Sequence, residues 1–110
     1  MKVTIEAGRY KGHIILPDFL TIVQVRAFED SFGDINQEEQ DGGRVWLSVS
    51  DADHLPAILS IVQEWHIENV PEKPTFDTFP FSPVKDAHEM VVQIFNAILN
   101  LWKGEEVPNA

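Results

Sequence analysis

Residues 2–16, KVTIEAGRYKGHIIL, carry the clearest folding signal in the chain. Apolar and polar residues alternate up to Ala7, and a period of two places successive side chains on opposite faces of a strand. The glycines of segment 8–12 permit the positive φ angles that a tight connection requires, and segment 13–16 is again apolar. The pattern predicts a β-hairpin over residues 1–16, with one face against a core.

A helix is predicted next, over residues 22–32. Thr21 and Gln24 match a capping box, in which each side chain accepts a hydrogen bond from the other residue's backbone N–H. Gly33 is well placed for a left-handed stop. The predicted apolar stripe of this helix consists of Ile22, Val25, Phe28 and Phe32.

The turn residues 41–43, Asp-Gly-Gly, precede a predicted third strand over 44–49. Its alternation directs Val45, Leu47 and Val49 to one face and therefore Trp46 to the other. An aromatic side chain on that second face is exposed unless another part of the chain or a partner covers it.

Two more helices are predicted in the second half of the chain. The first spans 55–67, with Pro56 in its first turn, where a missing N–H is tolerated. The second spans 83–103, with Pro83 at its start. The buried stripe of the first helix is Leu55, Ile58, Leu59, Val62 and Trp65, and that of the second is Ala87, Val91, Ile94, Ile98, Leu101 and Trp102.

The segment between these helices, 68–82, is predicted to be an extended strap. Four of the seven prolines fall within residues 68–83, and proline favours extended backbone in its own position and in the one before it. Three phenylalanines lie among the prolines and are predicted to anchor the strap: Phe76, Phe79 and Phe81. Residues 104–110 are expected to form a frayed tail.

Together these elements predict one α+β domain, a small sheet packed with three helices in the order ββαβαα. With 110 residues, 44% of them apolar and 24% charged, the chain has the composition of a single globular domain. It contains no cysteine, so disulfides and thiolate chemistry are excluded. No run is apolar enough to span a bilayer and no signal-peptide core is seen, so we expect a soluble, intracellular protein with no membrane partner.

The net charge of −10 is concentrated in the middle of the chain, where residues 34–80 carry ten acidic and two basic side chains. Nucleic-acid binding requires clustered Lys and Arg to replace phosphate counterions, so direct binding to DNA or RNA is not expected. The acidity has two interpretations. In the first, the acidic side chains keep a small protein soluble; in the second, they imitate a phosphate backbone, and the protein inhibits a DNA-binding protein.

The sequence contains no catalytic or metal-binding motif. None of the four histidines forms an HxxxH, HxH or HExxH pair. The acidic cluster 51–54 lacks the glycine and distal glutamate of a calcium loop and is interpreted as a helix cap. No nucleophile elbow or glycine-rich phosphate loop occurs. We therefore expect no enzyme activity, no cofactor and no metal.

Aromatic side chains are the remaining candidates for a functional surface, because they anchor many protein interfaces. Trp65 and Trp102 lie on the apolar stripes of their predicted helices and are interpreted as core. The predicted partner-binding residues are Trp46, Phe76, Phe79 and Phe81.

The arrangement resembles the tail assembly chaperones of long-tailed bacteriophages and prophages. The resemblance rests on the hairpin 1–16, the capped helix beginning at Thr21-Ile22-Val23-Gln24, and the segment Trp65 to Pro71 before a final helix. It implies a non-enzymatic protein in the cytoplasm of an infected or lysogenic bacterium. It also implies a tape-measure or other tail protein as the partner, and allows a homo-oligomer.

Overall fold

The N-terminal hairpin is present as predicted. In a computed structural model that describes residues 1–30 and 51–104, strand β1 (Lys2–Ala7) pairs antiparallel with β2 (Tyr10–Ile15). The turn consists of Gly8 and Arg9, and Gly8 has a φ of 59°. A Cβ at Gly8 would collide with the carboxyl group of Asp86, which also accepts a hydrogen bond from the Arg9 N–H at 3.3 Å. The positive φ therefore favours glycine here, and a Cβ would also force the Asp86 side chain to move.

The third strand of the described sheet comes from a segment that was predicted to be helical. Strand β3 (Glu64–Ile67) pairs antiparallel with β2, giving the order β1-β2-β3. Gly12 permits the close approach of the two strands, because a Cβ there would collide with the His66 carbonyl. The predicted strand over 44–49 lies outside the described residues.

The α+β class is confirmed, with one antiparallel sheet and three helices in the described parts of the chain. Their order is ββααβα, and the prediction of a helix over 55–67 was wrong at both ends. Pro56 lies inside the helix and not in its first turn, and the acidic cluster 51–54, interpreted as a cap, belongs to the helix. Helix α3 spans Asp51–Ile61 and the chain then becomes extended. Trp65 is buried as predicted, 5% exposed, but in a strand.

Local signals placed the other two helices well. Helix α1 (Ile22–Asp30) begins at the predicted residue, and the last two residues of its predicted range lie outside the described part. Helix α4 (Val84–Lys103) begins after Pro83 and ends at Gly104, whose φ is 79° and whose N–H contacts the carbonyls of Asn100 and Leu101. This is a left-handed helix stop.

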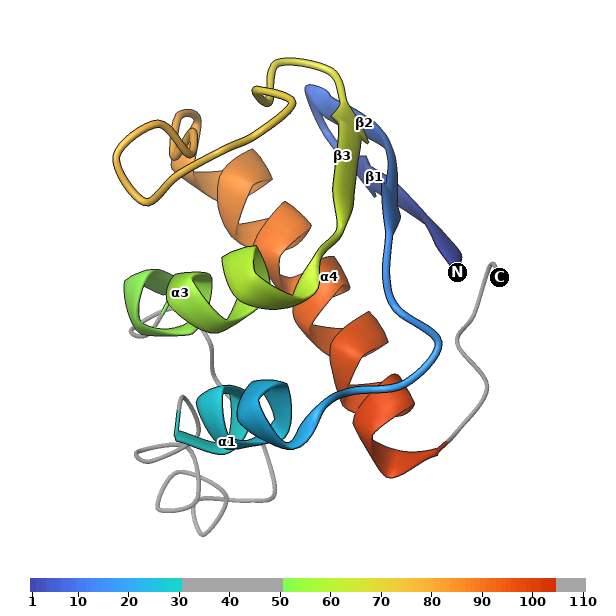
Figure 1. Cartoon of the computed structure of the whole chain (residues 1–110). Coiled ribbons are helices and arrows are strands. Elements are labelled where there is room, and N and C mark those ends of the chain that lie inside the picture. The colour runs from blue at the N-terminus through green and yellow to red at the C-terminus, as the bar shows by residue number, and fades with distance from the viewer. Residues whose placement is uncertain (31–50, 105–110) are drawn as a thin grey trace, which may run out of the picture.

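Helix α4 lies between the sheet and the other two helices (Figure 1). It buries the apolar stripe Ala87, Met90, Val91, Ile94, Phe95, Ala97 and Ile98. The opposing sheet face contributes Val3, Ile5, Ala7, Tyr10, Ile14, Trp65 and Ile67. None of the helices in the described ranges is long and apolar enough to cross a membrane. The core therefore lies on both sides of α4.

Candidate protein-interaction surface

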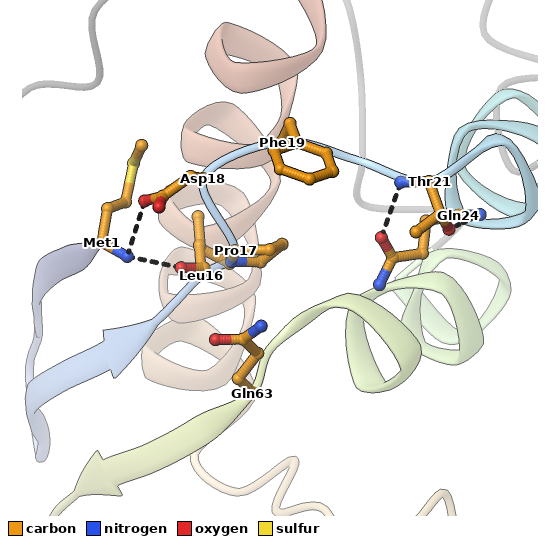
Figure 2. A pocket seen from close by; sticks show the side chains of 8 residues that line it. All are labelled: Met1, Leu16, Pro17, Asp18, Phe19, Thr21, Gln24 and Gln63. Carbon is orange, nitrogen blue, oxygen red and sulfur yellow. Dashed lines mark hydrogen bonds and ion pairs between the residues drawn. The ribbon is translucent and has the colours of Figure 1, made fainter.

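The loop between β2 and α1 leaves the sheet at Leu16 and is fastened to the N-terminus (Figure 2). The Met1 ammonium group donates a hydrogen bond to the Leu16 carbonyl and lies 3.8 Å from the Asp18 carboxylate. The next side chain, Phe19, is 75% exposed. The loop is thus held in place while its aromatic ring faces solvent.

The capping box fixes where α1 begins. The Thr21 N–H donates to Gln24 Oε1 at 2.9 Å, and the Gln24 N–H donates to Thr21 Oγ1 at 3.2 Å. Both donors would otherwise lack an intrahelical acceptor. The Gln24 amide also donates to the Ser60 carbonyl at 3.4 Å, which ties the start of α1 to the end of α3.

Two apolar residues in the first turn of α1 point into solvent. Ile22 is 83% exposed and Val23 is 74% exposed. Together with Phe19 they form what we call the α1 surface. Scattered exposed apolar residues are ordinary, but three large ones within five positions of a fixed loop and helix start indicate an interaction site.

A hollow of about 400 Å³ adjoins this surface, between the start of α1 and the end of α4. Its apolar lining includes Phe19 itself. Trp102, at one wall, is 39% exposed, and its ring centroid lies 6.4 Å from that of Phe28. The other apolar lining residues are Met1, Leu20, Val25 and Leu101. A large apolar side chain of a partner would find contacts on several sides here.

A second hollow, of about 410 Å³, shares Met1, Asp18 and Phe19 with the first (Figure 2). Its polar groups come from Met1, Asp18, Thr21, Gln24 and Gln63. The first four are already used in fastening the loop and capping α1. Within the described ranges, no three or more His, Asp or Glu side chains are grouped so that they could hold a metal ion. This hollow is therefore the more polar of the two, and the apolar contact area lies in the hollow beside Trp102.

The structure separates the four predicted partner-binding residues. Phe79 is 5% exposed and packs edge-on against Trp65, with ring centroids 5.5 Å apart. Phe81 is partly buried and packs against Phe79, with ring centroids 5.6 Å apart. These two anchor the strap to the core, which does not support a contact role. Phe76 is 55% exposed and remains available, and Trp46 lies outside the described residues.

Trp102 also differs from its prediction, because it is half-exposed at the end of α4 where core was expected. The residues of the α1 surface were missed in the sequence. The sequence does contain a signal for them. Near the start of this short helix there are more apolar side chains than one helix face can bury: Phe19, Leu20, Ile22, Val23 and Val25.

Comparison with known proteins does not assign the chain to a family or a function. No protein-family model, no curated protein and no solved structure matches the chain.

Proposed function

We propose that this protein acts by binding another protein and has no catalytic role, with the α1 surface as the contact. The observation that carries the proposal is the exposure of Phe19, Ile22 and Val23 beside the apolar hollow at Trp102. Burying such side chains removes apolar area from water, at about 25 cal/mol for each Å². A preformed apolar surface on a fixed loop is what a binding module requires.

Within that class, we propose a tail assembly chaperone of a long-tailed phage or prophage, acting in the bacterial cytoplasm. The sequence resemblance supports this choice, and the exposed α1 surface is compatible with shielding an aggregation-prone tape-measure or other tail protein. Self-association of the chaperone through the same surface is expected when the partner is absent. We propose that the protein does not bind nucleic acid directly and needs no cofactor.

The test is co-expression with a tape-measure protein of a long-tailed phage, measuring the soluble fraction of that protein. Wild type is compared with the triple variant Phe19→Ser, Ile22→Ser, Val23→Ser. Val84→Ser is the matched control, because Val84 is 72% exposed but lies at the opposite end of α4 from Trp102. We expect wild type and the control to keep the partner soluble and the triple variant to lose most of that effect.

Two results would count against the proposal in different ways. If the tape-measure protein is equally insoluble with and without wild type, the tail-assembly role is wrong. If the triple variant solubilises it as well as wild type does, the role stands and the α1 surface is not the contact.

A further inference from the structure

The outer face of the sheet carries two histidines side by side. His13 of β2 and His66 of β3 are directly opposed in the strand register. Their rings are stacked, with centroids 4.7 Å apart and an angle of 27° between the planes. Their strand neighbours Ile14 and Trp65 point into the core, so the alternation of both strands directs the two imidazoles outward.

A carboxylate fixes the orientation of one of these rings. Glu64 precedes His66 by two residues on the same face, and its Oε1 lies 2.9 Å from His66 Nε2. An ionised carboxylate accepts hydrogen bonds, so this contact assigns the hydrogen to Nε2 and, in the neutral ring, the lone pair to Nδ1. Metal-ligating histidines are commonly held in this way, with one ring nitrogen donating to a carboxylate and the other binding the ion.

We propose that His13 and His66 form a surface site for a divalent ion of borderline hardness, zinc or copper(II), with Glu64 as a positioning residue. Imidazole suits both ions. Metal–nitrogen bonds of about 2.0–2.1 Å let one ion join two nitrogens up to about 4 Å apart. The lone pair of an imidazole nitrogen lies in the plane of its ring, so one of the two stacked rings must turn out of the stack for both to bind the same ion.

The coordination is open. Within the described ranges no group of three or more His, Asp or Glu side chains could hold a metal ion, so the protein supplies two ligands and water supplies the rest. The charged neighbours act in opposite directions. Lys2, on the outer face of β1, acts electrostatically on the His13 ring and will oppose a bound cation there, whereas Glu64 favours it.

An ion at this site would join β3, the four-residue outer strand, to the hairpin. The fold does not depend on it, because the strands are already hydrogen bonded and packed on α4. Binding should therefore raise the melting temperature of the folded chain, and the stabilisation should grow with the logarithm of the free zinc concentration once that concentration exceeds the Kd. The proposal is independent of the α1 surface and of any tail-assembly role.

The experiment titrates zinc ion alone into the full-length chain, by calorimetry and by NMR of the histidine ring nitrogens. We expect one zinc per chain, displaced signals from His13 and His66, and an Nε2–H tautomer of His66 before zinc is added. His13→Asn and His66→Asn should each weaken binding at least about tenfold. Glu64→Gln should weaken it by about tenfold, the lower end of the range for such outer groups.

Two further variants separate ligation from misfolding. His88→Asn removes a histidine of α4 and should leave zinc affinity within about twofold of wild type. Lys2→Gln should strengthen binding, which a destabilised sheet would not do. Absence of stoichiometric binding at millimolar zinc, or equal weakening by His88→Asn and His13→Asn, would overturn the site. An Nδ1–H tautomer of His66 would overturn the role of Glu64.

Discussion

Helices α4 and α1 both carry apolar residues in their sequences, yet the fold treats them differently. α4 buries seven residues between the sheet and α3, whereas α1 buries only Phe28 and leaves Ile22 and Val23 in solvent. Folding buries the apolar face of α4. The apolar side chains of α1 are only partly buried, and the exposed ones are the reason for proposing a binding role for this helix.

The strongest test of this contrast is Phe95→Ala in α4. Phe95 is 1% exposed, and its ring centroid lies 5.1 Å from that of Phe28. Removing a buried phenylalanine should lower the free energy of unfolding by about 3–5 kcal/mol through lost burial and a residual cavity. Denaturant unfolding measures the change, with exposed Val84→Ala as control. A loss below about 1 kcal/mol would show that α4 is not the centre of the core.

A smaller effect is expected where α1 begins. Thr21→Ala removes the Oγ1 that accepts the Gln24 N–H, and should lower the free energy of unfolding by about 1 kcal/mol. Thr21→Ser keeps the acceptor and should recover most of that loss. Equal behaviour of the two variants in chemical unfolding would mean that the capping box does not stabilise α1.

The histidine pair predicts a modest dependence of stability on pH. Desolvation lowers the pKa of His13 below its ordinary value of 6.5, helped by Lys2 and His66 and opposed by Glu64. The unfolded chain then binds a proton more readily than the folded one, so the contribution of His13 is fully present above about pH 6.5 and falls as pH drops toward the folded-state pKa.

His13→Asn should therefore lose less stability than wild type between about pH 7 and 5, measured as the shift of the denaturant midpoint. Exposed Val84→Ala, which removes no titratable group, is the control and should follow wild type. If His13→Asn loses as much as wild type over this range, the pKa of His13 is not lowered by the fold.

The smallest expected effect concerns the α1 surface in the absence of a partner. Ile22→Ser combined with Val23→Ser should change the free energy of unfolding by no more than about 0.5 kcal/mol, because both side chains are already exposed. Denaturant titration of the purified protein checks this. A loss of 2 kcal/mol or more would mean that these residues are needed for folding, and the contrast with α4 would disappear.

What the sequence predicted correctly is what neighbouring residues determine. The hairpin follows from alternation and from Gly8, and the start of α1 follows from Thr21 and Gln24, which contact one another within a single turn. The end of α4 follows from Gly104. Each of these signals is complete within a few positions of the chain.

The errors concern features that depend on distant parts of the chain. Trp65 lies three residues after Val62, as in a helix, and two before Ile67, as in a strand, and only pairing with β2 decides between them. A helix over residues 64–67 leaves β2 without this strand partner, so the helical prediction excludes the pairing of His13 with His66. The exposure of Ile22 was missed for a similar reason, because burial depends on which helices pack together.

The central claim is that apolar contact at the α1 surface drives partner binding, and the salt dependence of affinity tests it most directly. We predict that the Kd of the purified complex with the tape-measure protein changes by less than about threefold between 0.05 and 0.5 M NaCl, because burial of apolar area is little screened by salt. If affinity instead falls steeply with salt and the triple variant binds as wild type does, the acidity of the chain is what recognises the partner, and the claim is contradicted.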